Sequence, residues 1–161
     1  MFRFIKGVVD SEDLPLSISR EKAQDSNLLR RIREVLTRKL IRFLEDTRKE
    51  DPEKYREFFI EYGYFLKEGV CHDPKFMDQI AKLLLFETSA NGEGELCTLD
   101  DYISRATPED KEIYYIVAPS RGAALASPYF ETFRRHNKEV LLLYNTVDDF
   151  VMSNVKTFGG E

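Results

Sequence analysis

Apolar residues recur along the first half of the chain every three or four positions, which is the period of an amphipathic helix. The longest such pattern runs from Ser19 to about Arg48 and predicts a helix over residues 19–49. At 1.5 Å per residue this helix is about 45 Å long, enough to separate two subdomains. Its apolar positions are Leu28, Leu29, Ile32, Val35, Leu36, Leu40, Phe43 and Leu44.

A small helical module is predicted over residues 50–84. Pro52 suits the first turn of a helix, and Gly69 is the expected C-cap of that helix. Asp73 and Pro74 then begin another helix. We interpret the apolar positions of both helices as core rather than as a ligand site. They are Tyr55, Phe58, Phe59, Tyr62 and Phe65 in the first, and Phe76, Met77, Ile80, Leu83 and Leu84 in the second.

The pattern changes after residue 84. Apolar runs over residues 113–117 and 139–144 predict strands, the second buried on both faces. Helices are expected from Thr98 to Arg105, from 120 to 136 with a break near Pro128, and from 148 to 158; Thr98 and Asp101 are spaced as a capping box. Strands that alternate with helices predict a small α/β/α layered subdomain over residues 85–161 with mainly parallel strands.

Residues 1–18 are expected to form an orphan strand and a loop. Residues 2–9 alternate as a strand does, but no hairpin partner follows, so an unpaired edge is predicted. An apolar loop braced by Pro15 comes next and leads to Arg20 at a helix N-terminus. The helix dipole disfavours a cation there. Either Glu21 and solvent offset this, or Arg20 projects outward to meet an anion.

The composition is that of a globular protein, with 42% hydrophobic and 33% charged residues in a chain of 161. The net charge of −5 disfavours nucleic acid as a partner. No apolar run approaches the length of a membrane span, and no targeting peptide is visible. Two cysteines are too few for a disulfide framework and favour a reducing compartment.

No complete active site is visible in the sequence. The glycine pairs lack the strand and helix that flank a phosphate-binding loop. Cys71, His72 and Asp73 are all potential metal ligands, but adjacent residues rarely converge on one ion and no second cluster exists, so no metal site is predicted. We therefore expect neither enzyme activity nor a cofactor in this stretch alone, which reads as a fragment that begins in mid-motif.

One long motif carries a resemblance to a known family. Residues 4–16 read FIKGVVDSEDLPL, and Ile18, Ser19, Arg20, Glu21 and Gln24 follow. This segment resembles the catalytic loop in the middle domain of the heat-shock-90 chaperones. The similarity continues through residues 80–84, 102–105, 113–116 and 127–128. The runs at 52–55 and 61–63 look most like the mitochondrial TRAP-type paralogue, with the bacterial form second.

The resemblance implies an ATPase assembled from several domains. Arg20 would reach the γ-phosphate of ATP, with Gln24 assisting, while ATP and Mg would be held by a separate N-terminal nucleotide-binding domain. Leu14, Leu16, Ser17 and Ser19 would dock the loop on that domain. A planar, permanently charged guanidinium suits this role, because it neutralises charge that develops on a transferring phosphoryl group.

The resemblance also implies partners and a location. Client proteins and co-chaperones would bind, and a C-terminal domain outside this sequence would form a homodimer. The mitochondrial matrix is the expected location, with the bacterial or eukaryotic cytoplasm as the alternative. Lys22 and Ala23 stand where the family usually has apolar residues. They support an alternative function, a non-catalytic α/β protein-interaction module that has lost its coupling to ATP.

Overall fold

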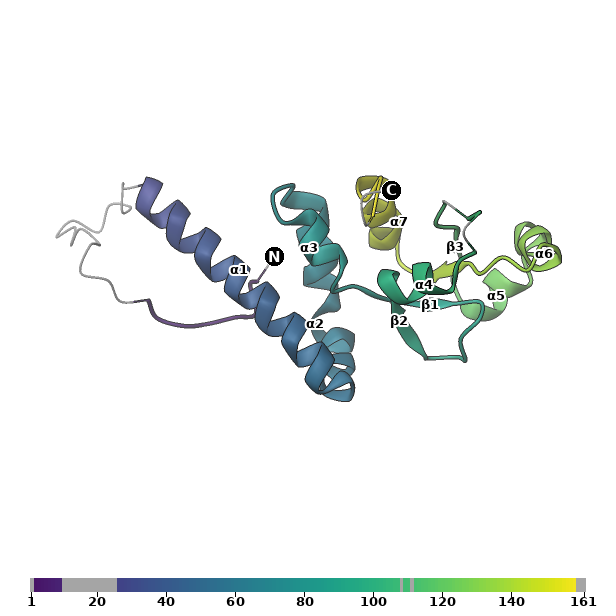
Figure 1. Ribbon diagram of the computed structural model, residues 1–161, viewed down its shortest axis with the longest axis horizontal. Helices are drawn as coiled ribbons and strands as arrows, with labels where there is room; N and C mark the ends of the chain where they lie inside the picture. The colour runs from purple at the N-terminus through teal and green to yellow at the C-terminus, as the bar shows by residue number, and fades with distance from the viewer. Residues whose placement is uncertain (1, 10–25, 108, 111, 159–161) are drawn as a thin grey trace.

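The computed structural model describes residues 2–9, 26–107, 109–110 and 112–158, and its elements follow one another along an elongated molecule. Figure 1 shows α1 at one end, α2 and α3 in the middle, and the sheet with α5 and α6 at the other end. Mixed helices and strands confirm the predicted α/β class. The division at residues 18, 49 and 84 stays a prediction.

The predicted long helix is α1 (Ser26–Glu50), whose proposed first residues, 19–25, lie outside the described part of the chain. It ends within two residues of the expected position. Asp51 caps the next helix, α2 (Pro52–His72), by accepting a hydrogen bond from the Lys54 amide at 3.1 Å. Pro52 occupies the first turn, as predicted, because its missing amide hydrogen costs nothing there.

Helix α2 continues past the glycine that was expected to end it. Gly69 is buried inside the helix, and the Asp73 amide bonds its carbonyl oxygen at 2.9 Å. The prediction was wrong because the next residue, Val70, is also buried, and its burial extends the apolar face by another turn. A helix does follow, but α3 (Met77–Ala81) is shorter than predicted: it starts after Phe76 rather than at Asp73 and Pro74, and it ends before Leu83 and Leu84.

The sheet has the order β2-β1-β4-β3, built from β1 (Leu85–Thr88), β2 (Leu96–Thr98), β3 (Tyr115–Val117) and β4 (Leu141–Leu143). The predicted pair β3 and β4 is parallel, and β4 is buried at all three positions. However, β1 pairs antiparallel with both β2 and β4. The expectation of mainly parallel strands was wrong because β1 and β2 form a hairpin too short to show a strand pattern.

Helices enclose this sheet. Helix α4 (Leu99–Arg105) begins with the predicted capping box, in which the Asp101 amide donates to Thr98 Oγ1 at 3.0 Å. The expected break near Pro128 separates α5 (Arg121–Leu125) from α6 (Pro128–Arg135). Helix α7 (Thr146–Asn154) packs against α2. It thereby joins the helical half of the molecule, α1 to α3, and the α/β half, which contains the sheet, into one core.

The predicted strand over residues 2–9 is absent. Among the described residues no strand pairs with this segment, and it makes only a turn in which the Ile5 amide donates to the Phe2 carbonyl oxygen at 3.1 Å. The lack of a partner agrees with the predicted unpaired edge, but a turn at Arg3 and Phe4 interrupts the strand-like alternation. Phe2 and Phe4 instead turn toward the aromatic residues of the helical module.

Candidate functional site

The residues predicted to act on ATP or on the nucleotide domain lie between the segment 2–9 and α1. All six fall in the stretch 10–25, outside the described residues, so their roles stay predictions: Leu14, Leu16, Ser17, Ser19, Arg20 and Gln24. The described residues on both sides define where this stretch is attached. It leaves the segment 2–9 after Val9 and enters α1 at Ser26.

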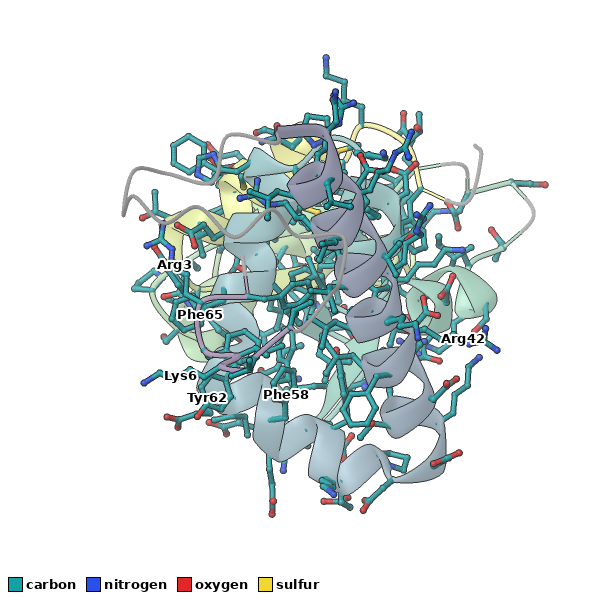
Figure 2. All side chains as sticks on the ribbon, turned by 90° about the vertical axis from the view of Figure 1, so that its left-hand side faces the viewer. Arg3, Lys6, Arg42, Phe58, Tyr62 and Phe65 are labelled. Carbon is teal, nitrogen blue, oxygen red and sulfur yellow. The ribbon has the colours of Figure 1, made fainter. Side chains whose placement is uncertain are left out.

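The segment before the loop is anchored by one aromatic ring. The centroid of Phe4 lies 4.8 Å from that of Tyr62, 5.6 Å from Phe65 and 5.7 Å from Phe58. Figure 2 shows these three α2 side chains together, with Arg3 and Lys6 of the segment beside them. Their spacing of three and four residues puts them on one helix face. The predicted aromatic stripe is therefore core at Tyr55 and Phe59, which are buried, and a half-buried docking face at the other three positions.

Positive charge surrounds the two attachment points. Lys6 is exposed, and Arg3 lies 3.7 Å from Glu68 of α2. Helix α1 has no acidic residue in its first turn, and Arg30 and Arg31 are exposed on the next turn. Among the described residues, exposed cations therefore stand on both sides of the stretch 10–25, beside the electropositive end of α1.

A polar cluster fastens the sheet to α5. Glu87 of β1 accepts hydrogen bonds from the Tyr144 hydroxyl at 2.7 Å, from Arg121 at 3.2 Å and from the Gly94 amide at 3.0 Å. Arg121 also donates to the carbonyl oxygens of Thr88 and Asn91. Burial and the Glu87 carboxylate raise the pKa of the Tyr144 hydroxyl. Both charged side chains of the cluster, Glu87 and Arg121, are paired with each other, so we interpret the cluster as stabilising the fold rather than as a binding site.

A second buried pair joins the two halves of the molecule. Lys67 of α2 lies 2.5 Å from Asp148 of α7, and these side chains are 12% and 5% exposed. The ammonium also lies 5.5 Å from the ring of Phe86 and 5.8 Å from that of Phe59. Asp148 additionally accepts a hydrogen bond from the Asn145 amide. This arrangement fixes α7 against α2.

The cysteines show no sign of reactivity. Burial raises the pKa of both the Cys71 and the Cys97 thiol, so neither is a thiolate at neutral pH. Within residues 2–9, 26–107, 109–110 and 112–158, no group of three His, Cys, Asp or Glu side chains is placed to hold a metal ion. His72 and Asp73 do not form such a group with Cys71.

A groove of about 520 Å³ lies between α4, the residues before β3 and the end of α7. Tyr102 lines the groove and ties two parts of the chain together there. Its hydroxyl donates to the Glu139 carbonyl oxygen at 2.9 Å and accepts from the Tyr114 amide at 3.1 Å. The groove could not be predicted from the sequence, since its walls combine residues between 99 and 115 with residues 152–158, far along the chain. The only local signal was the cluster of apolar and tyrosine residues at 113–117.

In the part of the chain that the structure describes, no helix has the length and apolar character needed to cross a membrane. The fold is thus a mixed α/β module in which the segment 2–9, held by Phe4, and helix α1 flank the stretch 10–25 of the sequence.

Comparison with known proteins identifies the family. Residues 1–161 match the family described as "Hsp90 protein", and this chain belongs to it. It is 48% identical over 161 residues to "TNF receptor-associated protein 1 homolog, mitochondrial" of Dictyostelium discoideum. It is 43% identical over 159 residues to "Chaperone protein HtpG" of Desulfitobacterium hafniense, and 44% identical over 158 residues to "Heat shock protein 75 kDa, mitochondrial" of Bos taurus.

These alignments cover nearly the whole of this chain but a small part of each relative. They include 98%, 99% and 97% of the chain and only 22%, 26% and 22% of the three relatives, in the same order. The chain therefore spans about a quarter of the length of the curated relatives it matches. Similarity extends to mitochondrial and bacterial relatives alike.

Proposed function

We propose that this chain is the C-terminal portion of the middle domain of an ATP-dependent Hsp90-type molecular chaperone. In this role Arg20 contacts the γ-phosphate of ATP bound to the N-terminal domain of the same protein, and Gln24 assists. Leu14, Leu16, Ser17 and Ser19 dock the loop on that domain. ATP and Mg belong to the N-terminal domain, and the stretch described by this sequence does not hydrolyse ATP alone.

The observation that carries this proposal is the match to the Hsp90 family over all 161 residues, which includes the loop motif. Two features of the structure support it. The segment before the loop is held by Phe4 on α2, and the residue after the loop begins a helix of 25 residues. Firm attachment at both ends limits the positions open to a catalytic side chain, which lowers the entropy cost of reaching the phosphate.

The wider role follows from the same membership. The protein acts in folding and binds non-native client proteins, works with co-chaperones, and dimerises through a C-terminal domain outside this sequence. The two mitochondrial relatives favour the mitochondrial matrix, and the HtpG relatives make the cytoplasm the alternative.

ATP hydrolysis by the full-length protein tests the role of Arg20. We expect Arg20→Ala to lower turnover about a hundredfold with little change in nucleotide affinity, because loss of about 3 kcal/mol of transition-state stabilisation has that effect. Gln24→Ala should cause a smaller drop. Arg42→Ala is the matched control, since Arg42 is an exposed arginine near the far end of α1 that pairs with Asp46.

Unchanged turnover in Arg20→Ala would contradict the proposal. It would favour the second candidate function, a non-catalytic interaction module, for which Lys22 and Ala23 in the docking loop are the specific observation. That module would retain client binding while nucleotide had no effect on it.

A further inference from the structure

The helical half and the α/β half share one apolar core. The chain passes from the first half to the second between α3 and β1 (Figure 1). Beyond that link the main contact is between α2 and α7, where Phe59 of α2 and Val151 of α7 are both buried. Apolar burial is not directional, so it favours close packing without selecting a single angle between the two halves.

Two polar contacts cross between the halves in the residues that the structure describes. In the first, exposed contact, Arg56 of α2 donates to the Gly94 carbonyl oxygen at 2.9 Å. In the second, Lys67 of α2 lies 2.5 Å from Asp148 of α7, and only 12% and 5% of these side chains are exposed. Water can replace a partner in the exposed contact, whereas separating the buried pair would leave two charges unpaired in a medium of low dielectric constant. The buried pair is therefore the contact that opposes sliding of α7 on α2.

Both partners of this pair are held in place by their surroundings. Asp148 lies in the first turn of α7, where its carboxylate accepts a hydrogen bond from the Asn145 amide at 3.3 Å. The Lys67 ammonium lies 5.8 Å from the ring centre of Phe59 on α2 and 5.5 Å from that of Phe86 on β1. The cation thus faces aromatic surface from both halves. A shift of the α/β half along α2 would separate this cation from Asp148 and from Phe86 together.

A buried ion pair adds little to stability, because the loss of hydration by both charges offsets their attraction. It does favour one arrangement over neighbouring ones, since only one brings the charges together. We propose that the Lys67–Asp148 pair is a latch, which holds the α/β half at one orientation to the helical half so that the two move as one rigid body. In the proposed chaperone function, on which this last step rests, the latch passes a displacement of the loop before α1 to α7.

Distance distributions in the full-length protein test the latch. Spin labels are attached through p-acetylphenylalanine at two exposed positions, Lys39 of α1 and Tyr129 of α6, so the native cysteines stay untouched. Double electron–electron resonance measures the distance between the labels, with unlabelled protein in excess so that distances within one chain dominate. Lys67→Met combined with Asp148→Asn removes both charges and keeps an oxygen for the Asn145 amide. We expect this variant to widen the distribution about twofold, because further orientations become populated.

Three further variants make the test specific. Asp148→Asn alone keeps the shape of the side chain, so it puts folding least at risk, and it should also widen the distribution. The matched control is the pair of Lys75 and Glu34, which lie 2.7 Å apart within the helical half. Lys75→Met combined with Glu34→Gln should leave the distribution unchanged. Leu141→Ala, which weakens the α/β half from inside β4, should lower the urea midpoint without widening the distribution.

A distribution of wild-type width in both Asp148 variants would overturn the latch. So would equal widening by Leu141→Ala, because the effect would then follow from lost stability alone. Hydrogen exchange tests the step that rests on the chaperone function: ATP should change the exchange of α7 amides in the wild type and not in the variant that lacks both charges. No change in the wild type, or equal changes in both proteins, would overturn that step. The distance measurement needs no nucleotide, so it decides the latch even if Arg20→Ala leaves ATP turnover unchanged.

Discussion

The helical half and the α/β half of the molecule differ in how deeply their apolar residues are buried. In α1 the residues Leu29, Leu36 and Phe43 lie two turns apart on one face, and they are 40%, 41% and 65% exposed. In β4 the three leucines are at most 2% exposed. The contrast arises because a sheet covered by helices encloses its central strand, whereas α1 packs mainly against α2.

This difference separates two uses of the same kind of residue. Buried leucines in β4 stabilise the fold by removing apolar surface from water. Apolar side chains that stay at the surface remove less apolar area from water and so contribute less to the stability of the fold. Stability should therefore depend strongly on the α/β half and weakly on the exposed face of α1.

The sharpest test of the contrast compares two leucine truncations. Leu141→Ala removes a fully buried side chain from β4 and should lower the free energy of unfolding by about 3 kcal/mol, through lost burial and the cavity left behind. Leu36→Ala on the open face of α1 should change it by about 0.5 kcal/mol or less. Urea denaturation followed by circular dichroism measures both. Similar losses in the two variants would show that α1 is packed as tightly as β4.

Polar pairing provides a second test within the α/β half. Glu87→Ala leaves Arg121 and the Tyr144 hydroxyl without their carboxylate partner and should lower the free energy of unfolding by about 2 kcal/mol. The control is Glu93→Ala, an exposed glutamate in the neighbouring loop, with an expected change near zero. The same denaturation measurement applies, and a loss no larger than that of the control would mean that the cluster does not fasten α5.

The smallest expected effect is a change in the free energy of unfolding at low pH. Burial alone would raise the pKa of Glu139, but its hydrogen bonds to Arg105, at 2.6 and 3.0 Å, outweigh this and lower the pKa below its usual 4.5. A carboxyl group whose pKa falls on folding stabilises the fold above its unfolded pKa, and this stabilisation is lost as the pH falls through the folded value. Wild type should therefore exceed Glu139→Gln in stability at pH 7, and the difference should shrink below pH 4.5.

Urea midpoints measured between pH 7 and pH 3 check this prediction. Glu93→Gln is the control, because Glu93 is exposed and has no ion pair with any described residue. A difference between wild type and Glu139→Gln that stays constant across this range would contradict a contribution from the ion pair.

Several elements could be predicted from local sequence because their signals are local. The capping box of Thr98 and Asp101, the start of α2 at Pro52 and the break before α6 each depend on residues within one helical turn. The buried character of β4 was visible in the unbroken run of apolar residues from Val140 to Leu143. The loop motif with Arg20 and Gln24 was likewise readable as a family resemblance, and its geometry stays a prediction.

Other features depended on contacts between distant residues. The hairpin of β1 and β2 was invisible because its strands are four and three residues long. The antiparallel pairing of β1 with β4 joins residues far apart in the chain, such as Thr88 and Leu141. The segment 2–9 alternates like a strand yet packs its Phe4 ring on α2, because no partner strand meets its backbone. The pairing of Glu87 with Tyr144 and the groove beside β3 likewise join residues that no sequence window contains.

The sequence by itself determined the family, the helix boundaries that capping residues set, and the candidate arginine. Tertiary structure alone decided which apolar residues are buried, which strand is left at the edge of the sheet, and which charged side chains meet between the two halves. The physical reason is that propensity and capping act within one turn of the chain. Burial and pairing depend instead on which surfaces meet, and that is settled only when the whole chain has folded.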